Sequence, residues 1–253
     1  MFENAVKERI RHGMPTFGLW ISLPCPSSVE LLASFGMDWL LFDTEHGPAT
    51  LETTEDLIRA AERSGVLPIT RVAANDAALI KQALDRGAYG VLVPLVSSAA
   101  EARSAVRAAK YPPDGIRGVA GTRVNRFGMD LPQYFAAWNE QVLVACQVET
   151  AEAVEHIDEI AAVAGLDVLF IGPNDLSASL NVFRQFDQPA FTNAVDKIQQ
   201  AARTHGVAVG YLASGAEETL ACVERGFLFV GAGSDARLLG SAAATLVSTI
   251  RAG

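Results

Sequence analysis

Cysteine is scarce in this sequence, and basic residues are outnumbered by acidic ones. Only three of the 253 residues are cysteines, at positions 25, 146 and 222, and no two have Cys-x-x-Cys spacing. This spacing argues against a disulfide scaffold and a thiolate zinc site. The 20 Lys and Arg residues against 29 Asp and Glu residues give a net charge of −9, which argues against the broad basic surface of a nucleic-acid-binding protein.

Long apolar runs are also lacking. No run approaches the length of about 18 to 20 uncharged residues that a membrane-spanning helix needs. Residues 1–10 mix charges at helical spacing, whereas a signal peptide has an uninterrupted apolar stretch after its basic start. We therefore expect a cytoplasmic protein without membrane or nucleic-acid partners.

The sequence instead contains a regular alternation of short apolar runs and longer amphipathic stretches. The eight apolar runs, typical of strands buried on both faces, are 17–23, 38–43, 66–72, 89–94, 142–148, 167–171, 207–212 and 227–230. The helical patterns are 50–64, 76–86, 98–110, 151–162, 190–205 and 216–224. Eight such units in about 250 residues predict a (β/α)8 (TIM) barrel as a single domain over residues 1–253, because a doubly wound sheet usually has fewer strands.

Two segments stand out from this alternation. Residues 111–141 are too long for an ordinary turn, and we interpret them as a functional loop or an inserted lid. The Gly231-Ala232-Gly233 segment after the eighth apolar run is similar to a phosphate-binding turn, although barrels also use such glycines for geometry alone.

In such a barrel the reactive groups lie at the carboxyl ends of the strands. His46 is the one histidine that follows a predicted strand, close in sequence to Asp43 and Glu45, and is a candidate acid or base; the alternative is a hydrogen bond within its loop. Arg71 ends the third strand, where it can bind a substrate anion or form a structural salt bridge. All four lysines fall on helical patterns, so none is placed to form a Schiff base with a carbonyl substrate.

Glu149 and Asp175 follow adjacent predicted strands. Burying two like charges close together is costly unless they share a cation or a proton. Oxygen ligands without cysteine favour Mg²⁺ or Mn²⁺. The alternative is that each acid caps the helix that follows it.

Taken together, the motifs resemble the HpcH/HpaI family of metal-dependent 2-keto-3-deoxy acid aldolases. The likeness spans nearly the whole chain, with motifs in the family's order. The matching segments are 38–48, the strand that ends at Arg71, 84–88, 111–118, 123–128, 147–150 and 171–177.

The resemblance implies a role for each candidate residue. Glu149 and Asp175 would hold a divalent metal (Mg²⁺, Mn²⁺ or Co²⁺), with no organic cofactor, and Arg71 would stabilise an enolate. His46 would move the proton, oriented by Asp43 and by Asp85 from a neighbouring subunit. The residues implied to contact substrate are Arg71, Gln147, Gly172, Pro173, Asn174, Asp175 and Leu212. The assembly would be a homohexamer whose subunits exchange a C-terminal helix. The apolar tail 238–250 would form that helix.

The implied activity is that of a class II pyruvate aldolase, which reversibly cleaves a 4-hydroxy-2-oxo acid to pyruvate and an aldehyde. Such cleavage needs a base for the C4 hydroxyl proton and an electron sink for the enolate, which a metal and Arg71 would supply. The shared motifs do not determine the aldehyde. The alternatives are a metal-dependent oxaloacetate-type decarboxylase on the same site, a metal-free phosphate-binding isomerase, and a barrel that serves only as an oligomeric scaffold.

Overall fold

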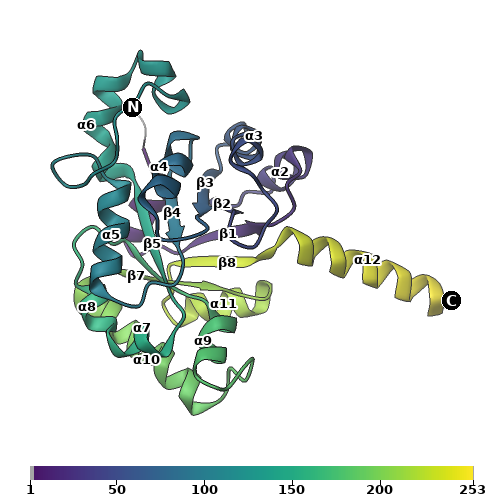
Figure 1. The fold of residues 1–253 in the computed structure, drawn as a ribbon. Coiled ribbons are helices and arrows are strands. Elements are labelled where there is room, and N and C mark those ends of the chain that lie inside the picture. The colour runs from purple at the N-terminus through teal and green to yellow at the C-terminus, as the bar shows by residue number, and fades with distance from the viewer. Residues whose placement is uncertain (1–2, 253) are drawn as a thin grey trace.

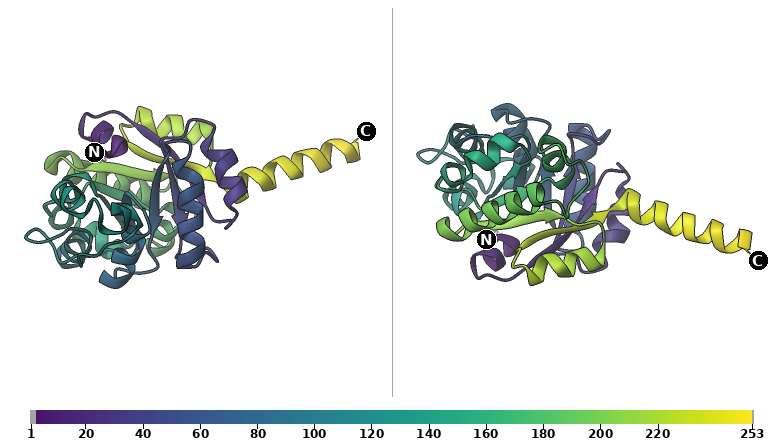
Figure 2. Two further views of the ribbon diagram at one scale, coloured as in Figure 1. Left: turned by 90° about the horizontal axis from the view of Figure 1, so that it is seen from above. Right: turned by 90° about the horizontal axis from the view of Figure 1, so that it is seen from below.

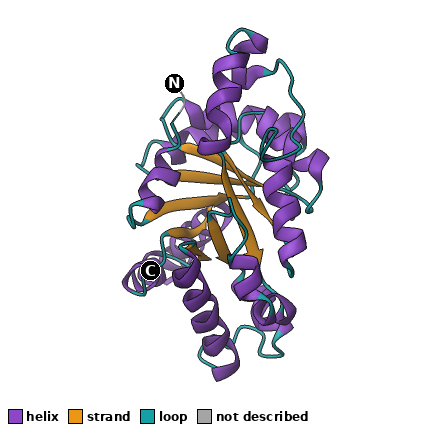
Figure 3. Cartoon of the chain, turned by 90° about the vertical axis from the view of Figure 1, so that its left-hand side faces the viewer, coloured by secondary structure: helices purple, strands orange, loops and turns teal. Residues whose placement is uncertain are grey.

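The computed structural model describes residues 3–252 and contains one closed barrel of eight parallel strands, each hydrogen-bonded to its neighbours in chain order, with β1 and β8 closing the ring. Figure 3 shows the strands at the centre with helices around them. The (β/α)8 prediction is therefore confirmed. The predicted domain, 1–253, includes residues 1, 2 and 253, which lie outside the described part of the chain.

Every strand overlaps one of the eight apolar runs, and β8 extends beyond its run to Ser234. The strands are β1 (Thr16–Ile21), β2 (Trp39–Asp43), β3 (Leu67–Arg71), β4 (Gly90–Val93), β5 (Leu143–Val148), β6 (Val168–Ile171), β7 (Ala208–Leu212) and β8 (Phe229–Ser234). All residues of β2, β3, β4, β5 and β6 are buried. Burial on both faces is the reason that these strands read as continuous apolar runs.

Helices follow the strands around the barrel. They are α1 (Ala5–Arg11), α2 (Pro26–Ala33), α3 (Leu51–Glu62), α4 (Ala77–Asp85), α5 (Ala99–Ala109), η1 (Arg123–Gly128), α6 (Leu131–Gln141), α7 (Ala151–Glu155), α8 (Ile157–Ala161), α9 (Pro173–Ser179), α10 (Pro189–His205), α11 (Ala216–Glu224) and α12 (Asp235–Ala252). Thr50, Asp76 and Ser98 cap α3, α4 and α5 with side-chain oxygens. The single helix expected over 151–162 is divided in two at His156.

The barrel interior is filled by large aromatic rings. Trp39 and Phe229 stack with centroids 4.1 Å apart, and Phe170 packs edge-on against Phe229. Gly18 makes room for this layer, because a Cβ there would lie 1.9 Å from the Trp39 ring. The barrel is thus a packed core and not a pore, which leaves its carboxyl-end mouth for chemistry.

The structure corrects the phosphate-turn interpretation. β8 continues through Gly231, Ala232 and Gly233 to Ser234, so these residues form strand and not a turn. A Cβ at Gly231 would lie 3.1 Å from Leu212 Cδ1, and Gly233 has a φ of +109°. The glycines therefore serve close packing and a left-handed backbone position.

The interpretation of residues 111–141 as a lid is also wrong, because the segment does not cover the carboxyl end of its own barrel. The segment contains η1 and α6, and α6 ends just before β5 begins. The Asn4 side chain donates to the carbonyls of Tyr89 and Gln141, which directly precede β4 and β5. The end of the segment therefore lies at the amino end of the barrel, opposite the carboxyl ends where reactive groups gather.

Helix α12 projects away from the barrel in all the ribbon views (Figures 1 and 2). Asp235, its first residue, is its one buried member among those the structure describes. Its large exposed apolar side chains are Leu238, Leu239, Leu246, Val247 and Ile250. Within residues 3–252, no helix is both long and apolar enough to span a membrane.

Candidate active site

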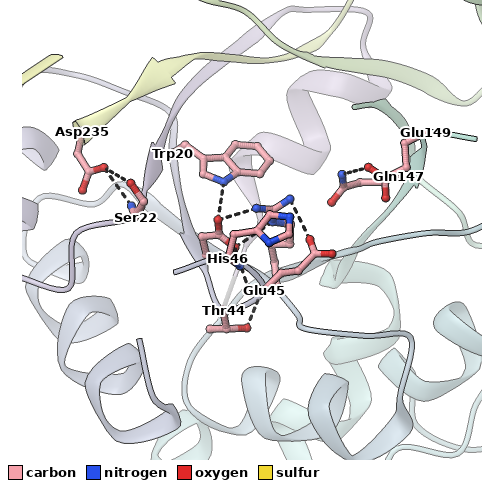
Figure 4. A network of polar contacts seen from close by, with 10 residues as sticks. Trp20, Ser22, Thr44, Glu45, His46, Gln147, Glu149 and Asp235 are labelled. Carbon is pink, nitrogen blue, oxygen red and sulfur yellow. Dashed lines mark hydrogen bonds and ion pairs between the residues drawn. The ribbon is translucent and has the colours of Figure 1, made fainter. Parts of the chain in front are cut away.

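Asp43 and Arg71 are the centre of a polar cluster at the barrel mouth. Figure 4 labels their neighbours Trp20, Glu45 and His46. They are direct register partners at the carboxyl ends of β2 and β3. Arg71 Nε donates to Asp43 Oδ1 at 3.0 Å, and Arg71 Nη2 donates to Oδ2 at 2.5 Å. Both residues are buried, with exposed fractions of 4% and 7%. A forked pair of this kind orients the guanidinium rigidly.

Three neighbours complete the surroundings of Arg71. Trp20 Nε1 donates to Asp43 Oδ2 at 3.3 Å, and the Arg71 guanidinium lies 5.1 Å from the centre of the Trp20 ring. Glu45 Oε2 lies 2.9 Å from Arg71 Nη1, and Thr44 Oγ1 donates to the Arg71 carbonyl at 2.6 Å. Asp43 uses two of the five guanidinium N–H donors and Glu45 faces a third on Nη1, so two are available to a substrate oxygen.

The charges of this cluster shift two carboxyl groups in opposite directions. Burial by itself would raise the pKa of Asp43, but the hydrogen bonds and charge of Arg71 outweigh it and hold that pKa below 3.8. Burial raises the pKa of Glu45, with Asp43 and Asp175 adding to the effect and Arg71 opposing it. Asp43 is therefore the ionised partner that fixes Arg71.

His46 lies exposed at the rim of the same cluster. Its backbone N–H donates to Asp43 Oδ1 at 3.2 Å, as does that of Glu45 at 3.0 Å. The hydrogen bonds within residues 3–252 thus join Asp43 to the backbone of His46 and not to its ring. The imidazole faces solvent, where it can exchange protons with a substrate or with water.

Gln147 and Glu149 form a second buried cluster at the carboxyl end of β5 (Figure 4). Glu149 Oε1 accepts the Leu95 N–H at 2.8 Å, and Oε2 accepts from Gln147 Nε2 at 2.6 Å. Burial raises the pKa of Glu149 to about 7, with a smaller contribution from the charges of Asp175 and Glu45. Gln147 Oε1 is buried and has no hydrogen-bond partner among the described residues, so this site has an acceptor free for a ligand.

The turn after β6 lies against this second cluster. A Cβ at Gly172 would lie 2.6 Å from Glu149 Oε2, so only glycine leaves space beside that carboxylate. Helix α9 begins at Pro173 with Gly172 as its N-cap, which places Asn174 and Asp175 in its first turn, both exposed. The capping alternative for the two acids is wrong, because α7 and α9 are capped by Thr150 and Gly172.

Asp85 does not join His46 within one chain. It ends α4, and its Oδ1 accepts from Arg117 Nη2 at 2.7 Å. Arg117 is itself buried, with its guanidinium 4.3 Å from the Trp138 ring centre and 4.7 Å from that of Tyr111. Helix α4 starts beyond the carboxyl end of β3 and runs back along the barrel, so Asp85 lies at the opposite end from His46.

A cavity of about 310 Å³ opens beside the Asp43 and Arg71 pair. It brings residues predicted from sequence together with ones that were missed. The predicted members are Asp43, Arg71, Pro173, Asn174 and Leu212, and missed members are Trp20, Arg184, Phe186 and Arg237. Trp20 lies within an apolar strand, so a Trp among aliphatic residues was the one available signal.

The donor set suits a hard divalent cation. Residues 3–252 contain no group of three or more His, Cys, Asp or Glu side chains placed to hold a metal ion, so protein side chains of these types would supply at most two ligands. Glu149 and Asp175 are close enough for their charges to interact, so they could supply two carboxylates. Gln147, whose Nε2 contacts Glu149, has an unpartnered Oε1 that could supply a carbonyl oxygen. A Mg²⁺ or Mn²⁺ ion held by one or two carboxylates, with water and substrate as its other ligands, matches this arrangement.

Comparison with known proteins identifies the family of this chain. The family model described as HpcH/HpaI aldolase/citrate lyase matches residues 16–242. The chain is 40% identical over 248 residues to 4-hydroxy-2-oxo-heptane-1,7-dioate aldolase from Escherichia coli, covering 97% of this chain and 94% of that protein. It is 36% identical over 252 residues to 5-keto-4-deoxy-D-glucarate aldolase from Shigella boydii serotype 18, covering 99% and 98%.

Solved structures of related proteins share this fold over nearly the whole length of the chain. An HpcH/HpaI aldolase/citrate lyase family protein from Burkholderia cenocepacia J2315 superposes with a TM-score of 0.93 at 36% identity, covering 98% of this chain and 99% of that one. A citrate synthase superposes with a TM-score of 0.87 at 31% identity, covering 98% of each chain. The relatives thus include named aldolases and a citrate synthase on the same fold, and the chain belongs to the HpcH/HpaI aldolase/citrate lyase family.

Proposed function

We propose that this protein is a class II pyruvate aldolase, acting as one domain over residues 1–253. It reversibly cleaves a 4-hydroxy-2-oxo acid to pyruvate and an aldehyde, with a divalent metal. The observation that carries the proposal is the meeting, at one barrel mouth, of the anchored Arg71 guanidinium with the buried Glu149 carboxylate and the unpartnered Gln147 carbonyl. The reactions named for the Escherichia coli and Shigella boydii relatives support the same class of substrate.

Each group has a role in this chemistry. When bound by Glu149 and Asp175, the metal would supply a Lewis acid for the carbonyl of the 2-oxo acid. Arg71 donates its free N–H groups to the oxygen that gains negative charge, and Asp43 with Trp20 keeps the guanidinium aimed. Such preorganised donors act most strongly where charge develops in the transition state.

Proton transfer and substrate binding fall to neighbouring residues. His46, exposed at the mouth, takes the C4 hydroxyl proton directly or through water. Gln147 lines the pyruvate side, and the Gly172–Asp175 turn, with Pro173 and Asn174, receives the pyruvate carboxylate. Leu212 lines the cavity on the aldehyde side.

We also propose a homohexamer in which α12 is exchanged between subunits. In support, α12 projects from the barrel with exposed apolar side chains, and these need a partner surface. Asp85 and His46 lie at opposite ends of the barrel within one subunit, so they cannot meet there. In such an assembly Asp85 of one subunit approaches His46 of the next.

The direct test is pyruvate release from a racemic 4-hydroxy-2-oxo acid, followed with lactate dehydrogenase. Protein stripped with EDTA should be inactive and should regain activity with Mg²⁺, Mn²⁺ or Co²⁺. Absence of release with every metal would refute the aldolase proposal.

A decarboxylase is the second candidate, because the same enolate can arise from oxaloacetate by loss of CO₂ at the same Arg71 and Glu149 groups. Oxaloacetate decay measured beside aldol cleavage separates the two activities by their kcat/KM values. The isomerase alternative depended on a phosphate-binding turn at Gly231–Gly233. These residues lie in β8, so that support is absent.

A further inference from the structure

A second cavity, of about 330 Å³, lies at the amino end of the barrel. Helix α1 and the end of α10 supply part of its lining, and the strand starts supply the rest. Leu143 and Ala208 are the first residues of β5 and β7, and Asp167 directly precedes β6. The cavity therefore lies at the opposite end of the barrel from Arg71 and Glu149, and none of its residues has a part in the proposed aldol cleavage.

Lys7 of α1 is a buried cation in the wall of this cavity, with 4% of its side chain exposed. Its Nζ donates to the Val142 carbonyl at 2.5 Å and to Asp167 Oδ2 at 3.0 Å. An ammonium group has three N–H donors, so these two side-chain contacts within residues 3–252 leave one donor over. Burial lowers the pKa of Lys7, and the charge of Asp167 opposes this effect. A second anion beside Lys7 would satisfy the remaining donor and offset part of the cost of burying the charge.

Two exposed arginines line the same cavity, and they differ in how their charge is matched. Arg203, in the last turn of α10, has no carboxylate within 4.0 Å among residues 3–252. Arg11 of α1 has one, Glu140 at 3.6 Å, and exposed ion pairs of this kind are weak. Lys7 and Arg11 are thus each matched by one carboxylate, and Arg203 adds one positive charge in excess, in a chain whose net charge is −9. One excess charge suits a ligand with a single carboxylate.

The rest of the lining is mainly apolar. Leu143 and Leu166 are buried, Leu228 is half-buried, and Ile10 of α1 lies with them in the wall. Sites for small molecules combine an apolar wall with a few polar groups, and their volumes usually begin at about 300 Å³. This cavity therefore has the size and the surface for a ligand with a short apolar chain and one acidic group.

We propose that this amino-end cavity is a binding site for a small carboxylate with an apolar chain, separate from the barrel mouth. Arg203 and Arg11 bind the carboxylate, the remaining N–H of Lys7 donates to one of its oxygens, and the chain packs on the leucine side chains. Paired N–H donors of a guanidinium favour a carboxylate over an uncharged group of similar size. The ligand contacts α1, α10 and the strand starts together, so it stabilises the folded chain. Binding at this site does not depend on the proposed aldolase function.

The test is calorimetric titration of the EDTA-treated native enzyme with hexanoate, without pyruvate or added metal. We expect saturable binding with a Kd of about 1 mM or tighter, which is within reach of a ligand of this size. Acetate, which lacks the chain, and 1-hexanol, which lacks the charge, should each bind at least about 10-fold more weakly. Hexanoate should also raise Tm once its concentration exceeds the Kd.

The arginine variants locate the site. Arg203→Gln should weaken hexanoate binding by about 10-fold, and Arg11→Gln should weaken it as well, because each removes a charged donor. Both arginines are exposed, so both variants should keep the native Tm in the absence of hexanoate. Arg184→Gln is the matched control, because Arg184 is also exposed but lines the barrel-mouth cavity, and this variant should keep the native affinity for hexanoate.

Three results would overturn the inference. The first is the absence of saturable binding up to about 10 mM hexanoate, or binding of 1-hexanol with equal affinity. The second is native affinity in Arg203→Gln and Arg11→Gln, which would show that these residues only complement the carboxyl ends of α10 and α1. The third is a loss of affinity in Arg184→Gln, which would place the ligand at the barrel mouth.

Discussion

Asp43 and Arg71 are register partners on adjacent strands, and two parallel hydrogen bonds of 3.0 and 2.5 Å join them at the barrel mouth. The pair is buried, so the desolvation cost of the carboxylate is offset only while the guanidinium is present. One interaction thus supports both the fold and the proposed electron sink. Replacement of either residue should affect stability and activity together.

Arg71→Lys should lower kcat for aldol cleavage by about 100-fold, because a point charge cannot copy the forked contact with Asp43 and still face the substrate. Steady-state kinetics with the 4-hydroxy-2-oxo acid measures this effect. Arg203→Lys on α10 is the control and should keep native kinetics. A fully active Arg71→Lys enzyme would remove Arg71 from the enolate role.

Arg71→Gln should destabilise the fold by about 3 to 5 kcal/mol at neutral pH, because Asp43 is left buried and unpaired. The folded-state pKa of Asp43 lies below 3.8, so its contribution is complete above about pH 4 and is lost as the pH falls through that lowered value. Urea unfolding at pH 7 and pH 3 should show the difference between native and variant protein shrinking at the lower pH. An equal difference at both values would contradict the assigned ionisation.

Glu149→Gln should lose metal binding and aldol cleavage together. Changing a group that only supports a metal ligand costs about 10- to 100-fold in affinity, so loss of a ligand should cost more than about 100-fold. Calorimetric titration with Mn²⁺ measures the affinity. Glu159→Gln, on the exposed surface of α8, is the matched control. Native Mn²⁺ affinity in Glu149→Gln would refute the metal assignment.

The raised pKa of Glu149 predicts how pH changes stability. In the metal-free protein this pKa is about 7, above the ordinary 4.5, so the stability it contributes is present below pH 4.5 and is lost as the pH rises through 7. Thermal unfolding should show this slope in the native chain and not in Glu149→Gln. Mn²⁺ should raise Tm at pH 8 and have little effect at pH 5, where the carboxyl is protonated. A Tm response equal at both pH values would count against Glu149 as a ligand.

His46→Ala should depress aldol cleavage far more than pyruvate methyl-proton exchange, because the enolate can form without the group that handles the C4 hydroxyl proton. Both rates can be followed on one preparation, by coupled assay and by proton NMR. His156→Ala, at the exposed junction of α7 and α8, is the control. Equal losses of the two rates would show that His46 does not act on the hydroxyl.

Sequence periodicity alone determined the barrel and the order of the groups around its mouth, because strands buried on both faces must be continuously apolar and their ends must be polar. For the same reason Asp43, His46, Arg71, Glu149 and Asp175 could be identified as strand-end residues. A family resemblance added their roles.

Tertiary structure decided which of these groups touch. The pairing of Asp43 with Arg71 follows from strand register, and the contact of Trp20 with Asp43 depends on which way a strand side chain points. The continuation of β8 through Gly231 follows from its pairing with Leu212 of β7 and Gly18 of β1, which apolar patterning does not report. Arg184 comes from the loop between α9 and α10 and Arg237 from α12, more than 50 residues apart in sequence, so only the closed barrel brings them to one cavity.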